Sequence, residues 1–154
     1  MTKSIDFYFD FISPYSYLAH QKIKVIKETK NINFNYKPVL LGGLHNLQGI
    51  TAPAFIKPKL KHMISDCDLI AKKNKFEFVW NSKFPTNSLN IMRGCLFINN
   101  KIKELYLDKI FDANWKDNLD TSNEKILKKI LEKCDISLAN FLEGIKDPKI
   151  KDKL

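Results

Sequence analysis

The chain of 154 residues is long enough for one domain with a buried core, and its composition excludes several classes of protein. It is 44% hydrophobic and 28% charged, with 5 Gly and 6 Pro, which excludes disordered, linker-like and collagen-like sequences. No apolar run approaches the ~18 residues of a membrane span, and the early acids Asp6 and Asp10 exclude a secretory signal. We therefore expect a cytoplasmic protein that does not bind membranes.

The net charge of +9 is spread along the whole chain. Arg93 is the only Arg among the 26 basic residues, and the lysines are interspersed with acids along the chain. Nucleic-acid sites usually combine Arg with clustered charge and aromatic residues, so we expect no nucleic-acid partner. A generally positive surface instead favours anionic small molecules.

Cysteine and histidine spacing predicts no metal site. The residues concerned are Cys67, Cys95, Cys134, His20, His45 and His62. The cysteines are odd in number, lie far apart and form no C-x-x-C pair, which argues against a disulfide framework, a zinc ribbon or a dithiol redox centre. The histidines show no spacing typical of metal ligands.

The first forty residues predict a strand, a helix and a second strand. Apolar and polar residues alternate over 5–12, which is typical of a strand. Ser13 is a good N-cap and Pro14 suits the first helical position, so we expect a helix from here to about residue 30. A second strand follows over residues 34–41. Two strands joined by a helix form a parallel βαβ unit, normally right-handed.

Beyond residue 41 the sequence predicts helices and no further strand. We expect Gly42-Gly43 to end the βαβ unit, and loops or short helical turns over 44–58. The expected helices cover residues 59–74, a segment from 87 or 88, 101–113, 122–134 and 135–145. The predicted domains are thus a βαβ unit at residues 1–44 and a helical domain at residues 45–154.

Ser13 stands where a strand leads directly into a helix. The unpaired N–H groups of a helix N-terminus and its partial positive charge attract anions. The Ser13 hydroxyl either caps these N–H groups or turns toward the end of the strand, where it can donate a hydrogen bond to a bound anion. A thiolate is such an anion, since helix N-termini lower the pKa of a thiol.

The segment Asp6–Ala19, DFYFDFISPYSYLA, resembles the N-terminal signature of 2-hydroxychromene-2-carboxylate isomerases and kappa-class glutathione transferases. These families belong to the DsbA-like branch of the thioredoxin fold. The collinear resemblance continues through Lys37–Gly43, Lys59–Met63 with Asp66, Phe84–Leu89 with Met92 and Arg93, Trp115 and Asp147–Lys151. It implies an α/β fold in which a thioredoxin-like βαβ half carries a large all-helical insertion.

In this family, serine replaces the first cysteine of a C-P-Y-C dithiol. Ser13 and Ser16 hold the two positions here, which excludes a dithiol oxidoreductase. The resemblance implies that Ser13 hydrogen-bonds the sulfur of glutathione and favours its thiolate. In the implied isomerase reaction the thiolate adds to a conjugated carbon of a small aromatic substrate, the former double bond rotates, and the thiolate leaves, so glutathione acts as a cofactor. A kappa-class transferase, in which the thiolate remains attached, is the alternative.

The resemblance also assigns weaker site positions. Lys59 aligns with a lysine that contacts glutathione, although a solvated lysine at a helix end is the alternative. His45 and Phe84 align with substrate-binding positions, and Phe84 is equally typical of a core aromatic. Ile50 departs from the family, since relatives often have an asparagine that contacts glutathione there, and Leu69 stands where relatives have an arginine.

Relatives continue with a helix, a Gly-Val-Pro-Thr-like loop, two antiparallel strands and a final helix. The sequence reaches Leu154 without any of these, so the resemblance implies that the C-terminal ββα unit is absent. One edge of the first strand would then be open. The further alternatives are an inactive truncated remnant, or an interaction module that joins a partner through this edge, with a homodimer as one form.

Overall fold

A computed structural model describes residues 3–154. The chain divides into two compact units, one ending at Phe78 and the other beginning at Val79. Within the described residues there are two strands, eight α-helices and one 3-10 helix. No helix in this part of the chain is long and apolar enough to cross a membrane. The predicted domains, residues 1–44 and 45–154, separate the βαβ unit from the helical segment rather than one compact unit from another, and they stay a prediction.

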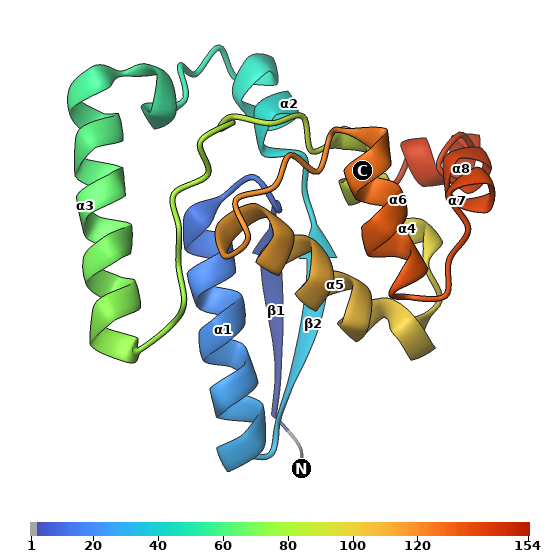
Figure 1. Ribbon diagram of the computed structural model, residues 1–154, viewed down its shortest axis with the longest axis horizontal. Coiled ribbons are helices and arrows are strands. Elements are labelled where there is room, and N and C mark those ends of the chain that lie inside the picture. The colour runs from blue at the N-terminus through green and yellow to red at the C-terminus, as the bar shows by residue number, and fades with distance from the viewer. Residues whose placement is uncertain (1–2) are drawn as a thin grey trace. The chain divides into compact units, whose positions relative to one another are not determined.

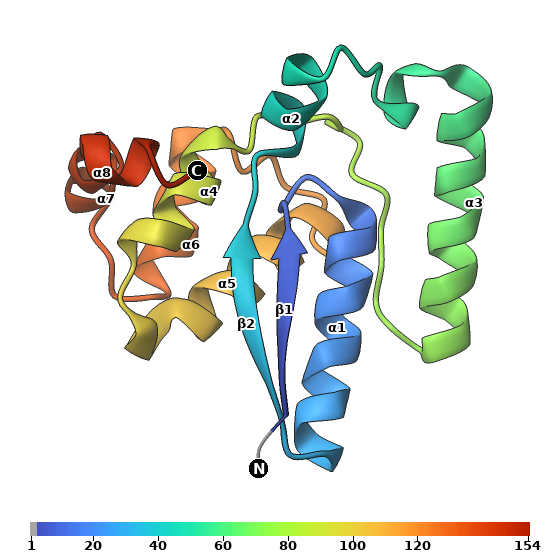
Figure 2. The ribbon, with the colours of Figure 1, turned by 180° about the vertical axis from the view of Figure 1, so that it is seen from behind.

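The first unit contains the predicted βαβ unit followed by further helices. Its elements are β1 (Lys3–Phe9), α1 (Pro14–Thr29), β2 (Ile32–Pro38), α2 (Leu41–Leu47), the 3-10 helix η1 (Pro53–Phe55) and α3 (Lys57–Asn74). β1 and β2 are parallel, which confirms the predicted topology. Figures 1 and 2 both show α3 beside α1, with the two helices beginning at the same end of the unit.

The sheet has one apolar face and one polar face. In the parallel register, Phe7 lies opposite Tyr36 and their rings meet edge to face at 5.3 Å. The Tyr36 hydroxyl and Nδ1 of His20 in α1 are hydrogen-bonded at 2.6 Å, so α1 covers this apolar face. On the opposite face, the Asn35 side-chain amide donates to Oδ1 of Asp6 at 2.9 Å, and both residues are exposed.

β1 ends three residues earlier than the predicted end at residue 12. Asp10 causes this difference: its Oδ1 accepts the N–H of Ile12 at 3.1 Å, and its backbone oxygen accepts the N–H of Ser13 at 3.0 Å. These bonds form a tight turn in place of an extended strand. The expected strand over residues 5–12 was therefore correct in type and wrong at its end.

The segment after β2 also differs from the prediction. β2 ends at Pro38, before the predicted end at residue 41. Gly42 and Gly43, expected to end the βαβ unit, lie inside α2. The N–H of Leu41, at the start of α2, donates to Oδ2 of Asp10 at 2.8 Å. This bond satisfies one of the N–H groups that a helix start leaves without a backbone partner.

The second unit is entirely helical within the described residues. Its helices are α4 (Leu89–Phe97), α5 (Asn100–Trp115), α6 (Glu124–Glu132), α7 (Leu138–Gly144) and α8 (Pro148–Lys151). The expected helices are confirmed with shifted ends, and α8 was not predicted. α6 begins at Glu124, after Asn123, whose side chain accepts the N–H groups of Lys125 and Ile126, so the predicted start at residue 122 was two residues early.

Candidate functional site

Ser13 lies just beyond the carboxyl end of β1 and caps α1. Its Oγ accepts the N–H of Ser16 at 3.2 Å, and Pro14 occupies the first turn of the helix. The side chain is half-buried. Serine is a preferred N-cap and proline a preferred first helical residue, so the local sequence determines the geometry at the start of α1. The capping role is confirmed.

Capping does not occupy the hydrogen of the Ser13 hydroxyl. A serine hydroxyl carries one O–H donor and two acceptor lone pairs, and the bond from Ser16 uses a lone pair. The two roles that the sequence presented as alternatives are therefore compatible. The same side chain can cap α1 and donate to an anion at the start of this 16-residue helix.

Asp10 organises this end of the unit and was not identified from the sequence. It is 2% exposed, and its two carboxylate oxygens accept the N–H groups of Ile12 and Leu41. It thereby holds both the turn leading to Ser13 and the start of α2. An aspartate bonding to the backbone two residues later is an ordinary turn signal, so the bond to Ile12 was within reach of sequence analysis.

Tyr15, in the first turn of α1, connects this turn to α3. Its hydroxyl donates to Oδ2 of Asp66 at 2.8 Å. Burial first, and then the hydrogen bond to Asp66, raise the pKa of Tyr15 well above its usual range. Tyr15 therefore remains a neutral hydrogen-bond donor at physiological pH.

Cys67 follows Asp66 in α3 and is fully buried. Burial, reinforced by the negative charge of Asp66, raises the pKa of the Cys67 thiol to about 12. The thiolate is the nucleophilic form of cysteine, so a thiol held in its protonated form is a poor nucleophile. Cys67 is thus a packing residue beside the Tyr15–Asp66 bond.

Lys59 and His45 belong to the same unit as Ser13. Lys59 lies in the first turn of α3, is exposed, and makes no hydrogen bond or ion pair with the other described residues. His45 lies in the last turn of α2 and is half-buried. No hydrogen bond or ion pair within residues 3–154 joins either side chain to Ser13, so their ligand-binding roles stay predictions. Ile50 is 54% exposed and Leu69 is 65% exposed, with no polar side-chain atoms to offer.

Phe84 belongs to the second unit. Its ring lies edge to face on Trp80, with centroids 5.1 Å apart, and 5.8 Å from the ring of Trp115. Phe84 is half-buried and Trp115 is fully buried, so Trp115 is a core residue of this unit. The assignment of Phe84 to substrate binding stays a prediction.

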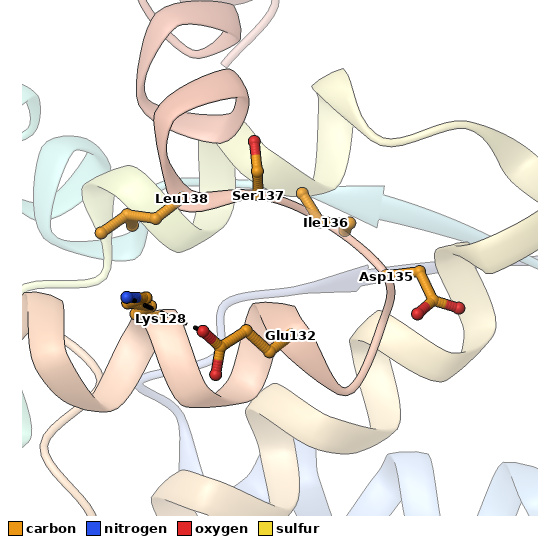
Figure 3. A pocket seen from close by; sticks show the side chains of 6 residues that line it. All are labelled: Lys128, Glu132, Asp135, Ile136, Ser137 and Leu138. Carbon is orange, nitrogen blue, oxygen red and sulfur yellow. Dashed lines mark ion pairs between the residues drawn. The ribbon is translucent and has the colours of Figure 1, made fainter.

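A surface pocket in the second unit contains none of the predicted site residues. Figure 3 shows the side chains that line it, from α6, the segment that follows it and the first residue of α7: Lys128, Glu132, Asp135, Ile136, Ser137 and Leu138. Its volume is about 320 Å³, and Lys128 and Glu132 form an exposed ion pair at 3.9 Å. No group of three or more His, Cys, Asp or Glu in the described chain could hold a metal ion.

Comparisons with known proteins support the resemblance found in the sequence. Residues 4–154 match the family model of the DSBA-like thioredoxin domain. The chain is 26% identical to a 2-hydroxychromene-2-carboxylate isomerase of Sphingobium xenophagum over 151 residues, which cover 96% of this chain and 76% of the relative. It is 24% identical to glutathione S-transferase kappa 1 of Homo sapiens over 166 residues, covering 100% of this chain and 73% of the relative.

The fold agrees with that of a solved relative. The structure of a selenomethionine 2-hydroxychromene-2-carboxylate isomerase matches with a TM-score of 0.85 at 22% identity, and the match covers 97% of this chain and 74% of the other. The chain thus spans about three quarters of the length of each of these relatives.

Proposed function

The chain belongs to the DSBA-like thioredoxin domain family, as its motifs predict, and on this premise we propose that it binds glutathione at the start of α1. The Ser13 hydroxyl donates a hydrogen bond to the glutathione sulfur and stabilises the thiolate. The thiolate, rather than a side chain of the protein, is then the nucleophile, and we place the reaction in the cytoplasm.

One observation carries this proposal: the Ser13 oxygen caps α1 while its hydroxyl hydrogen remains available. A free thiol has a pKa of ~8.5, and both a hydrogen-bond donor and a helix N-terminus favour its ionised form. A hydrogen bond to a charged group contributes about 1.5–3 kcal/mol, which corresponds to about one to two pKa units. A shift of two units brings the pKa of the thiol to about 6.5, at which the thiolate is the main form at neutral pH.

We favour an isomerase reaction of the kind named in the Sphingobium relative. The thiolate sulfur forms a bond to a conjugated carbon of a small aromatic substrate, and the electron pair of the former double bond moves onto the conjugated system. Rotation about the resulting single bond follows, the carbon–sulfur bond breaks, and the double bond re-forms. Glutathione is returned unchanged. Lys59 supplies a cation for the carboxylates of glutathione, and His45 and Phe84 contact the substrate.

A kappa-class transferase is the alternative reaction at the same site. The human relative carries that name, and the chain covers about three quarters of its length. The thiolate would then remain attached to the electrophile. Product analysis separates the two reactions, because an isomerase leaves free glutathione and a transferase leaves a glutathione conjugate.

The proposed function is tested with a series of variants at Ser13. We expect bound glutathione to show thiolate absorbance near neutral pH, and Ser13→Ala to raise the pKa of the bound thiol by about one to two units. Ser13→Thr keeps both the cap and the donor, and should retain the signal. Ser13→Asp keeps the cap but removes the donor at neutral pH, and should lose the signal.

Ser137→Ala is the matched control for the loss of the cap. The Ser137 oxygen accepts the N–H of Asn140 at 3.2 Å, the same length as the bond from Ser16 to Ser13, but it caps α7 in the other unit. Either substitution should reduce stability by about 1 kcal/mol, and only Ser13→Ala should change the thiolate signal. A folded protein that binds no glutathione, or a signal that survives Ser13→Ala, would contradict the proposal.

The open edge of β1 favours a second candidate, an interaction module. Phe9 directs its carbonyl oxygen toward β2, where it accepts the N–H of Val39. Since successive residues of a strand direct their backbone groups to opposite sides, Ser4, Asp6 and Tyr8 direct theirs away from β2. No backbone partner for these three lies within residues 3–154. This candidate predicts a dimer or a heteromer, and a monomer by light scattering contradicts it.

A further inference from the structure

We propose that Tyr15 is a positioning residue for glutathione, which holds α3 and its Lys59 in place relative to Ser13 through the hydrogen bond to Asp66. The inference rests on the proposed function and adds to it a residue that acts without touching the ligand. Tyr15 is 39% exposed and its hydroxyl lies 2.8 Å from Oδ2 of Asp66, a residue 51 positions further along the chain.

Two contacts show that α1 and α3 run in the same direction. Tyr15 near the start of α1 bonds to Asp66, and Lys22, seven residues later, donates through Nζ to Oδ1 of Asn74 at 3.0 Å. Asn74 lies eight residues after Asp66, so the two helices advance together. Figures 1 and 2 both show this side-by-side arrangement.

Because Asp66 lies beside the first turn of α1, the residues of α3 that precede Asp66 lie beyond the N-terminal end of α1. Lys59 precedes Asp66 by seven residues, or about 10 Å of helix, whereas Tyr15 already lies in the first turn of α1. Seven residues are close to two full turns, so Lys59 lies on the same face of α3 as Asp66. Lys59 is therefore about 10 Å past the level of Tyr15, on the side of the α1 N-terminus.

The separation suits an extended tripeptide. Three residues in an extended conformation span about 10 Å, and the thiol belongs to the middle one, so a carboxylate lies at only part of this distance from the sulfur. The long, exposed Lys59 side chain can cover the remainder when the sulfur meets the Ser13 hydroxyl. Simultaneous contact requires that α3 stay fixed beside the first turn of α1. The Tyr15–Asp66 bond is the side-chain hydrogen bond between the two helices that lies nearest to Ser13 among those described.

The inference predicts that loss of the Tyr15–Asp66 bond changes the affinity for glutathione but leaves the ionisation of its thiol unchanged. Tyr15→Phe removes the bond but keeps the ring and the Ser13 cap. We expect the Kd for reduced glutathione, measured by calorimetry, to rise about three- to tenfold, the range of one ordinary hydrogen bond. The pKa of the bound thiol, measured by thiolate absorbance, should equal that of the wild type.

Three variants sharpen the test. Asp66→Asn retains an oxygen that accepts the Tyr15 hydroxyl and should keep an affinity near that of the wild type, whereas Asp66→Ala should match Tyr15→Phe. Lys22→Met is the matched control, because it removes the contact between the same helices at their far end, and it should leave the Kd unchanged.

A double-mutant cycle between Tyr15 and Lys59 tests positioning directly. If Tyr15 acts by placing Lys59, adding Tyr15→Phe to Lys59→Met should change the Kd by less than about twofold, so the two effects will not multiply. The inference is overturned if the fold-changes in Kd of the two single variants multiply in the double variant. It is also overturned if Tyr15→Phe leaves the Kd for glutathione unchanged, or if Tyr15→Phe shifts the pKa of the bound thiol. If the wild type binds no glutathione, the proposed function fails as well. If glutathione binding depends on Ser13 but is unaffected by Tyr15→Phe, only the positioning role of Tyr15 is overturned.

Discussion

The N–H of Leu41 donates a hydrogen bond of 2.8 Å to Oδ2 of Asp10, which joins the start of α2 to the turn after β1. The other carboxylate oxygen of Asp10 accepts the N–H of Ile12, so one buried side chain satisfies two backbone donors from separate segments. A buried donor that loses its partner retains the full cost of leaving water. Asp10 is therefore a structural support of the candidate site.

Asp10→Ala should reduce the free energy of unfolding by about 2–4 kcal/mol, because it leaves the N–H groups of Ile12 and Leu41 without acceptors. Asp10→Asn should cost less, since its amide oxygen still accepts one of them. Urea unfolding followed by circular dichroism measures both. Asp152→Ala, an exposed acid near the C-terminus, serves as the control and should change stability by less than about 0.5 kcal/mol.

Gly94→Ala should destabilise the second unit. A Cβ at Gly94 would overlap the ring of Phe141 and the hydroxyl of Tyr106, both of which are fully buried. Tyr106 cannot move aside freely, because its hydroxyl donates to the carbonyl oxygen of Ile91 at 2.7 Å. Overpacking of this kind costs about 1–3 kcal/mol, measured as a lower midpoint of thermal or urea unfolding.

Gly42→Ala is the matched control for Gly94→Ala. It also replaces a glycine inside a helix, but a Cβ at Gly42 has no neighbouring atom within 4 Å. Alanine has the higher helix propensity, so this variant should be neutral or stabilising by up to about 1 kcal/mol. Equal effects at the two glycines would show that the close packing around Gly94 does not govern its stability.

Local signals made much of the first unit predictable. Alternating residues predict β1, and the Ser13-Pro14 pair predicts the start of α1, because strand alternation and helix capping depend on neighbours in the sequence. The parallel pairing of β1 and β2 follows from the βαβ order. The capping pattern and the family resemblance point to the same residue, Ser13, on different grounds.

Contacts between distant residues account for what the sequence did not reveal. The bond from Leu41 to Asp10 spans 31 positions and allows a helix to start where a strand was expected. The bond from Tyr15 to Asp66 spans 51 positions, and neither residue carries a periodic signal that would pair them. Sequence patterns report burial and turns, whereas the partner of a polar side chain is determined by tertiary structure.

The three cysteines should be unreactive in the native protein. Cys67, Cys95 and Cys134 are free and buried, and burial raises the pKa of each thiol, to about 12 for Cys67 and Cys95. A thiol reagent at about pH 8 should label none of them in the folded protein and all three in denaturant, since the thiolate is the reactive form. Rapid labelling of the folded chain would contradict their assignment as packing residues.

The same thiols predict a loss of stability at alkaline pH. An unfolded thiol ionises near pH ~8.5, whereas burial keeps Cys67 and Cys95 protonated up to about pH 12. Between these values the folded state binds more protons than the unfolded state, so the free energy of unfolding falls as the pH rises. Below about pH 8 both states are protonated, and these thiols contribute no pH dependence.

Urea unfolding across this range measures the effect, and Cys95→Ala isolates the contribution of one thiol. Cys95 is 1% exposed, and burial outweighs the opposing charge of Lys103 in setting its pKa. Above pH ~9, the Cys95 thiol should lower the free energy of unfolding by up to about 1.4 kcal/mol for each pH unit. The Cys95→Ala variant, although less stable at neutral pH, should therefore lose stability more slowly than the wild type between about pH 9 and 11. An equal slope in the two proteins would show that the Cys95 thiol ionises alike in the folded and unfolded chains.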